Sequence, residues 1–301
     1  MKSILVTGAT VFIGSRLVSD LVEKGYDVST LVRKGKHVEK KTNEIVGDVT
    51  DSELDFGDNT FDCVFHLASK TPLEKNSKVL EKVNLDGTKN LFNALNGKIK
   101  SIVYISGLGV YGSPQETIID ENTPHDPNTN FVKIRVNAEN FLRDNCRKNN
   151  IKFSVIYFGD VYGSKGWFYE FIVKRLLKKS FRIPGNGLYC KGFVHVDDAV
   201  GSIIKIMEKE LFEESFIVAD SSPCTFRDFV NYTADQIGVK HPGTVPLFLA
   251  RAVLGSELIK LLTTSMQVSN KKISDVYDFK YPSYIEGISN VLSELKQENR
   301  L

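Results

Sequence analysis

Residues 7–14 read Thr-Gly-Ala-Thr-Val-Phe-Ile-Gly, and their surroundings make this stretch decisive for the fold. The apolar run at residues 3–6 precedes it and predicts a first β-strand. Apolar residues then recur at helical spacing from Ile13 to Leu21, and Gly25 offers a C-terminal stop. A glycine turn between a strand and a helix directs backbone N–H groups and the positive helix end at a pyrophosphate. We therefore favour a dinucleotide-binding turn over a merely structural one.

The rest of the chain alternates short apolar runs with longer stretches of helical period, which is typical of βαβ units around a parallel sheet. The pattern predicts strands at 27–32, 44–46, 63–67, 101–106 and 153–158, and helices at 77–95 and 131–147. We expect an α/β fold: a Rossmann doubly wound parallel sheet with a smaller C-terminal substrate domain. Residues 1–162 should form the dinucleotide-binding domain, with 193–220 returning to it, and residues 163–192 and 221–301 the substrate-type domain.

The composition excludes several kinds of partner. The chain has 301 residues and a formal net charge of +2, which favours neither a nucleic acid nor an acidic membrane and leaves an unidentified small molecule as the expected ligand. Its four cysteines lie far apart, so we predict neither disulfides nor a metal site. The first residues lack a signal peptide's apolar region, and we expect a cytoplasmic location. Charges interrupt the apolar stretch 245–262, which predicts an amphipathic helix rather than a membrane span.

Further motifs follow the glycine turn in a fixed order. They are Gly47-Asp48-Val49-Thr50-Asp51, His66-Leu67-Ala68, Val83-Asn84-Leu85-Asp86-Gly87-Thr88, Val110-Tyr111-Gly112, Val161-Tyr162-Gly163 and Phe193-Val194-His195-Val196-Asp197-Asp198. With these motifs the chain resembles the extended short-chain dehydrogenase/reductase family over nearly its whole length. That family includes the NAD-dependent epimerases and dehydratases of sugar nucleotides and the hydroxysteroid-dehydrogenase-like reductases, and its glycine motif is TGATGFIG. Many members are dimers built on the helices that match 77–95 and 131–147, so a homodimer is expected by analogy.

The resemblance implies a division of labour around a bound dinucleotide. The positions implied are Gly8, Thr10, Val11, Phe12, Ile13 and Gly14 at the pyrophosphate, Asp48 and Val49 at the adenine, Leu67 and Ala68 at the adenosine ribose and phosphates, and Arg135 at a ribose. Arg33 adds a separate indication. An arginine about 20 positions after the glycine turn accommodates the 2′-phosphate of NADP, where NAD sites carry an acidic residue. With Lys34 and Lys36 nearby, we predict NADP over NAD, although a solvated basic loop would have the same composition.

The positions that carry the family's chemistry are substituted. The resemblance implies a serine or threonine, a tyrosine and a lysine, and this chain has Gly107, Phe131 and Arg135 instead. Phenylalanine has no acidic hydroxyl, so it cannot exchange a proton. Phe131 and Arg135 still share a helix face, but a guanidinium does not replace a lysine ammonium geometrically.

Other side chains nearby offer weaker replacements for the tyrosine. Lys133 should be solvated on the far side of its helix, and Ser106 should face away from the position of Gly107. Tyr111 and His66 remain open, with core or loop roles favoured. His195, Asp197 and Asp198 suggest a metal only faintly, because an aspartate there more naturally caps the helix that follows.

Val11 stands where the family has glycine, and its branched side chain would crowd the pyrophosphate or strain the turn if positive φ is required. Three functions are therefore open. The first is an NAD(P)-binding protein with standard redox chemistry lost or strongly reduced. The second is an active NADP-dependent oxidoreductase or epimerase with a non-standard proton donor. The third is an interaction protein without a cofactor, if Val11 closes the site.

Overall fold

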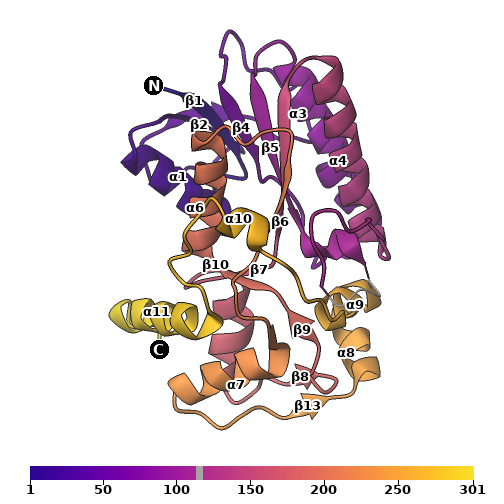
Figure 1. The fold of residues 1–301 in the computed structure, drawn as a ribbon, viewed down its shortest axis with the longest axis vertical. Coiled ribbons are helices and arrows are strands. Elements are labelled where there is room, and N and C mark those ends of the chain that lie inside the picture. The colour runs from indigo at the N-terminus through magenta and orange to yellow at the C-terminus, as the bar shows by residue number, and fades with distance from the viewer. Residues whose placement is uncertain (113–117) are drawn as a thin grey trace. The chain divides into compact units, whose positions relative to one another are not determined.

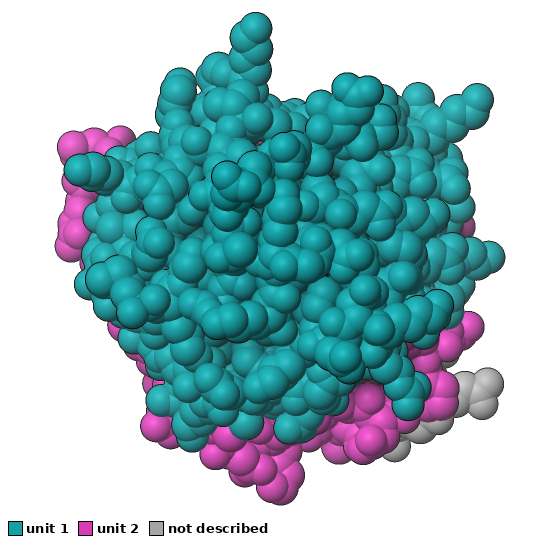
Figure 2. Space-filling view, turned by 90° about the horizontal axis from the view of Figure 1, so that it is seen from above, with its two compact units in different colours: residues 1–110, 127–157, 200–216 teal, residues 111–126, 158–199, 217–301 magenta. Residues whose placement is uncertain are grey.

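The computed structural model describes residues 1–112 and 118–301, which form two compact units. The first unit comprises Met1–Val110, Pro127–Tyr157 and Val200–Phe216, and the second comprises Tyr111–Asp126, Phe158–Ala199 and Ile217–Leu301. Figure 2 colours the two units separately. The second unit thus includes 111–126, 158–162, 193–199 and 217–220, which the sequence assigns to the first domain. Which unit holds a substrate is not decided by compactness, so the substrate-type domain stays a prediction.

A seven-stranded sheet forms the centre of the first unit. Its strands are β1 (Ser3–Thr7), β2 (Asp27–Val32), β3 (Asn43–Val46), β4 (Cys63–His66), β5 (Ser101–Gly107), β6 (Lys152–Phe158) and β11 (Ser215–Val218). Their order is β11-β6-β5-β4-β1-β2-β3, and the pairs from β5 to β3 are parallel. The order reverses at β1 and β4, which is the doubly wound arrangement that the alternating pattern predicts. The predicted Rossmann fold is confirmed.

Helices cover both faces of this sheet. They are α1 (Phe12–Glu23), α2 (Ser77–Glu81), α3 (Gly87–Leu95), α4 (Asn130–Lys148) and α6 (Val196–Glu208), with a short 3-10 helix, η2 (Leu108–Tyr111), after β5. In Figure 1, α3 and α4 lie on one side of the strands, and α1 and α6 on the other. The central strands are buried on both faces, which explains their continuous apolar runs. Apolar residues at helical spacing, such as Leu17, Val18 and Leu21 of α1, turn inward to meet them.

The predicted helix over 77–95 contains an irregular turn. A π-helical segment, η1 (Lys82–Asp86), separates α2 from α3 and carries the buried Asn84. The Asn84 side chain exchanges two hydrogen bonds with the backbone of Lys70, of 2.8 and 3.0 Å, in the loop that follows β4. Such single π-turns frequently mark functional sites, and this one fixes a loop at the carboxyl edge of the sheet.

The second unit is built from short strands and helices. The strands are β7 (Asp160–Tyr162), β8 (Ile183–Pro184), β9 (Cys190–Lys191), β10 (Phe193–His195), β12 (Cys224–Thr225) and β13 (Thr244–Val245). The helices are η3 (Phe168–Val173), α5 (Lys174–Leu177), α7 (Phe226–Gln236), α8 (Leu247–Leu254), α9 (Ser256–Thr263), α10 (Lys271–Ser274) and α11 (Tyr284–Gln297). Aromatic rings form its core, where Phe193 and Phe229 stack with centroids 3.9 Å apart. None of the described helices is long and apolar enough to cross a membrane.

Asp198 corrects one expectation from the sequence. It does not cap a helix that starts after it, because α6 already begins at Val196. The Asp198 carboxylate is fully buried and accepts hydrogen bonds from the Tyr277 hydroxyl and from the backbone N–H groups of Lys280 and Tyr281. It therefore anchors the segment before α11. The described residues contain no cluster of three or more side chains arranged to hold a metal ion.

Candidate cofactor-binding site

The parallel register brings most of the predicted cofactor positions to one edge of the first unit's sheet. Thr7 at the end of β1 pairs with Leu31 of β2 on one side and with His66 of β4 on the other. The residues that follow these strand ends are therefore neighbours. They are the glycine turn after β1, Arg33 after β2, Asp48 and Val49 after β3, Leu67 and Ala68 after β4, and Gly107 at the end of β5. Ligands of open α/β sheets bind at this carboxyl edge.

The two glycines of the turn are required by close backbone packing. Gly8 has a φ of 71°, and a Cβ there would lie 2.8 Å from the backbone nitrogen of Ala68. A Cβ on Gly14 would lie only 2.1 Å from the carbonyl oxygen of Gly8. Side chains at either position would push the turn away from α1 and from β4. Glycine is thus needed here by the fold itself, before any ligand is considered.

Val11 fits the turn without strain. Its φ of −104° and ψ of 171° are ordinary extended values, so the positive φ considered from the sequence is not required. Its side chain is 53% exposed and makes no capping hydrogen bond to α1.

The N–H groups of Phe12, Ile13 and Gly14, in the first turn of α1, have no hydrogen-bond partner among the described residues. Three unpaired donors at a positive helix end are what a pyrophosphate needs.

A buried chain of hydrogen bonds holds the residues next to the glycine turn in place. Thr7 Oγ1 lies 2.8 Å from Nδ1 of His66, and Nε2 of His66 lies 2.9 Å from Thr88 Oγ1. Thr88 donates to the carbonyl oxygen of Asn84 at 2.7 Å, so it must accept from the Nε2–H of His66. Nδ1 then accepts from Thr7, whose oxygen accepts from the N–H of Ala68 at 3.2 Å. With these donor and acceptor roles, the side chains of Thr7, His66 and Thr88 all have their hydrogen bonds satisfied.

His66 is thereby excluded as a replacement proton donor. Both ring nitrogens are occupied, and the side chain is 1% exposed. Burial, with a smaller contribution from the charge of Arg135, lowers the pKa of His66 to about 3. The sequence pattern does not predict this network, although both quoted motifs, His66-Leu67-Ala68 and Val83 to Thr88, contain its members. The spacing of Asn84 and Thr88 by one helical turn was the available signal.

The neutral state of His66 predicts a pH dependence of stability. The folded-state pKa lies below the unfolded value near 6.5, so the stabilisation is present above pH 6.5 and is lost as the pH falls toward 3. Between pH 7 and pH 5, the wild type should lose about 2 kcal/mol of unfolding free energy that a His66→Gln variant retains. Urea unfolding of both proteins at the two pH values measures this difference. Parallel pH profiles would show that His66 does not titrate as described.

Arg33, Asp48 and Val49 occupy different environments. Arg33 is exposed, with no ion pair to a described residue. The Asp48 carboxylate accepts from the backbone N–H and the hydroxyl of Thr50, both at 2.8 Å, which holds the turn after β3. Val49 is buried against Gly87, and its carbonyl accepts from Asn90 at 3.1 Å. Of these three residues, Arg33 has an exposed charged group that makes no ion pair with a described residue and could bind a ligand.

The three substituted positions lie on β5 and α4. Gly107 ends β5, and Phe131 is the second residue of α4, which Thr129 caps by accepting from the Val132 N–H. Arg135, one turn after Phe131, is buried and donates to the carbonyl oxygen of Ile105.

The Arg135 guanidinium also lies over the Tyr104 ring, 4.5 Å from its centroid. Burial raises the pKa of Tyr104 to about 12, against the opposing charge of Arg135. Arg135 is therefore engaged with β5, and the Tyr104 phenol remains protonated at neutral pH.

The remaining candidates for proton transfer differ in accessibility. Ser106 is 8% exposed, and its hydroxyl has no hydrogen-bond partner among the described residues. Lys133 is exposed, as predicted. Tyr111 is fully buried in the second unit, where its ring meets His125 edge-on at 5.4 Å. Ser106 thus offers an unused hydroxyl near the end of β5.

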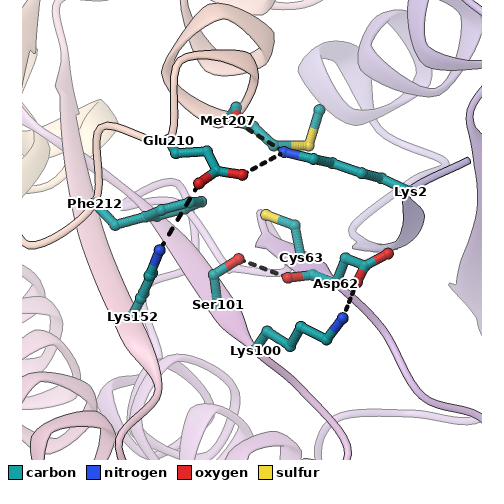
Figure 3. Close-up of a pocket in the computed structure, with 9 residues that line it drawn as sticks. All are labelled: Lys2, Asp62, Cys63, Lys100, Ser101, Lys152, Met207, Glu210 and Phe212. Carbon is teal, nitrogen blue, oxygen red and sulfur yellow. Dashed lines mark hydrogen bonds and ion pairs between the residues drawn. The ribbon is translucent and has the colours of Figure 1, made fainter.

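A cavity of about 160 Å³ lies at the opposite, amino edge of the sheet (Figure 3). Its lysines come from the starts of β1, β5 and β6, and each is paired: Lys2 with Glu210 at 3.2 Å, Lys100 with Asp62 at 2.7 Å and Lys152 with Glu210 at 3.9 Å. Paired, solvated lysines at this edge do not form the cofactor site, because ligands of such sheets bind at the carboxyl ends.

Comparison with known proteins agrees with this geometry. The NAD dependent epimerase/dehydratase family matches residues 4–219, which include the whole glycine turn and all the strand ends described above. The chain belongs to this family. A curated relative, the 3-diazoavenalumate denitrifying reductase of a Streptomyces species, is 26% identical over 304 residues, covering 95% of this chain and 98% of the relative.

Solved structures of this family share the fold. The UDP-glucose 4-epimerase of Thermotoga maritima with UDP-glucose aligns with a TM-score of 0.85 and 21% identity, covering 99% of each chain. A human epimerase family protein with NADPH also aligns with a TM-score of 0.85, at 20% identity, covering 97% of this chain and 100% of the other. At these identities the likeness establishes the fold of the family member and no particular activity.

Proposed function

We propose that this protein binds a nicotinamide dinucleotide at the carboxyl edge of its sheet and has lost, or strongly reduced, the standard redox chemistry of its family. The observation that carries this proposal is the contrast between the two halves of the site. The glycine turn keeps its close packing and its three unpaired N–H groups, whereas Phe131 and Arg135 replace the pair that exchanges a proton. Binding is supported, and proton transfer is not.

The residues present fit such a cofactor. Gly8 and Gly14 bring the backbone of the turn against α1, so the N–H groups of its first turn would hold the pyrophosphate. When bound, the nicotinamide would supply hydride transfer. Arg135 uses one of its five N–H donors for Ile105 and lies over Tyr104, so its contact with a ribose stays part of the proposal.

The proposal is tested with protein and cofactor together. We expect NADPH to be bound, while a panel of sugar nucleotides and hydroxysteroids gives neither a converted product by chromatography nor a change in nicotinamide absorbance. Sustained oxidation or reduction of the nicotinamide with any of these substrates would contradict the loss of chemistry. Binding of neither NADPH nor NADH would contradict the cofactor site and favour the interaction protein without a cofactor.

A second candidate is an active NADP-dependent oxidoreductase or epimerase. The observation that favours it is the buried Ser106 hydroxyl without a described partner, near the position where the family has its own hydroxyl residue. If Ser106 takes part, any turnover found in the substrate panel should fall about 100-fold or more in Ser106→Ala. Unchanged turnover in that variant would remove Ser106 as the donor.

The proposed preference for NADP depends on Arg33. Arg33→Ala should weaken NADPH binding about 10-fold or more and leave NADH binding within about twofold, because a charge-assisted hydrogen bond to the 2′-phosphate is lost. Calorimetric titration of both cofactors measures this. Lys100→Ala is the matched control, since it removes the same charge at the amino edge of the sheet. Equal losses for both cofactors would contradict the assignment of Arg33 to the 2′-phosphate.

A further inference from the structure

Helix α8 of the second unit is apolar on the side that faces water. Its sequence, Leu-Phe-Leu-Ala-Arg-Ala-Val-Leu, contains one charged residue, and Phe248 is 68% exposed, Leu249 46% and Val253 71%. At 100° per residue, positions 248, 249, 252 and 253 cover one continuous arc of about 140°. Ala250, the buried residue of α8, lies outside this arc. A helix face whose apolar side chains are this exposed normally meets an apolar partner or environment.

A basic segment adjoins the strand that leads into this helix. Strand β13, just before α8, pairs with β8, which follows the basic segment 174–182. Leu247 of α8 packs on Gly185, since a Cβ added to Gly185 would lie 3.1 Å from Leu247 Cδ2. The Arg182 side chain lies beside Gly243 in the same way, at 3.8 Å. The two segments, residues 171–185 and 240–256, therefore adjoin each other.

Charge in these two segments is strongly one-sided. They hold seven of the chain's 39 lysines and arginines and none of its 37 aspartates and glutamates, so the rest of the chain is net negative. The seven are Lys174, Arg175, Lys178, Lys179, Arg182, Lys240 and Arg251. Lys174 pairs with Glu170 at 2.7 Å, and the other six make no ion pair with a described residue. The near-neutral total charge conceals this local concentration.

We propose that α8 and the adjoining basic segment 174–182 form a docking surface for an anionic membrane, with the apolar arc of α8 in the headgroup region. Exposed aliphatic and aromatic side chains flanked by unpaired cations suit an anionic bilayer, where apolar burial and charge attraction add. Nucleic acid offers no comparable environment for Leu249 and Val253. The docking is peripheral and independent of the proposed cofactor function.

Vesicle co-sedimentation of the full chain tests this docking surface. The wild type should sediment with vesicles of phosphatidylcholine and phosphatidylglycerol, and less with phosphatidylcholine alone or at high salt. The double variant Phe248→Ser, Leu249→Ser should bind about 10-fold or more weakly, because the apolar side chains no longer enter the bilayer. Lys178→Glu with Lys179→Glu should lose about 10-fold on the anionic vesicles only.

Ile285→Ser provides the matched control, since Ile285 is 46% exposed on α11 in the same unit. It should bind the vesicles like the wild type, and thermal melts should show that all variants fold, because the side chains removed are exposed. Three outcomes would overturn the proposal: no vesicle binding by the wild type, an equal loss in Ile285→Ser, or a dimer that needs Phe248 and forms in place of vesicle binding.

Discussion

Gly14→Ala is expected to destabilise the protein by about 3 kcal/mol or more, although alanine normally stabilises a helix relative to glycine. The new Cβ would lie 2.1 Å from the carbonyl oxygen of Gly8. Neither atom can rotate away, because the Cβ is attached directly to Cα and the oxygen belongs to the backbone. Relief requires moving α1 away from the turn, which also displaces the N–H groups of Phe12 and Ile13. NADPH affinity should therefore fall together with stability, by about 100-fold or more.

Gly25→Ala is the control that separates this steric clash from the cost of replacing a glycine of positive φ. Gly25 has a φ of 80° but no atom within 4 Å of an added Cβ, so the cost should be only about 1–2 kcal/mol. Urea unfolding and calorimetric titration of the two variants give the comparison. A Gly14→Ala protein as stable as the wild type would show that the turn does not pack as described.

Restoring the family's residues together, as Gly107→Ser with Phe131→Tyr and Arg135→Lys, is expected to raise any basal turnover by about 100- to 10,000-fold. Tyrosine regains an acidic hydroxyl, and lysine on the same helix face can lower its pKa. The loss of Arg135 from the Tyr104 ring should cost some stability, so the activity is compared at equal folded fraction.

Phe141→Tyr is the control for this restoration, because it adds the same hydroxyl to another ring of α4, one that meets Phe92 at 5.8 Å. Turnover is followed by chromatography of the sugar-nucleotide products, and any net oxidation or reduction by nicotinamide absorbance. No gain in the triple variant, while NADPH still binds, would mean that the geometry around α4 and β5 no longer suits the family's reaction.

Sequence periodicity was sufficient to predict β1 to β6, because the central strands are buried on both faces and so read as continuous apolar runs. It did not predict the edge strand β11. The predicted strand 27–32 has the bounds of β2, and the helix predicted at 131–147 differs from α4 by one residue at each end. The carboxyl-edge position of Gly8, Arg33, Asp48 and Ala68 follows from the parallel topology alone. What they bind remains a proposal.

Three features depend on tertiary contacts and could not be read from local pattern. The hydrogen-bond chain through His66 joins residues from β1, β4 and α3, whose proximity only the fold establishes. Arg135 has the spacing of a cofactor ligand, yet its position against Ile105 and Tyr104 depends on how α4 packs on β5. Asp198 resembles a helix cap but bonds a segment about 80 residues later in the chain.

The central claim is that the site binds a nicotinamide dinucleotide without the family's proton transfer. Native mass spectrometry of the purified protein, titrated with NADPH and then with NADH, tests its first half most directly. We predict one cofactor per chain, with NADPH bound more tightly. Failure of both to bind at millimolar concentration would contradict the account, because the unpaired N–H groups of α1 would then not form a pyrophosphate site.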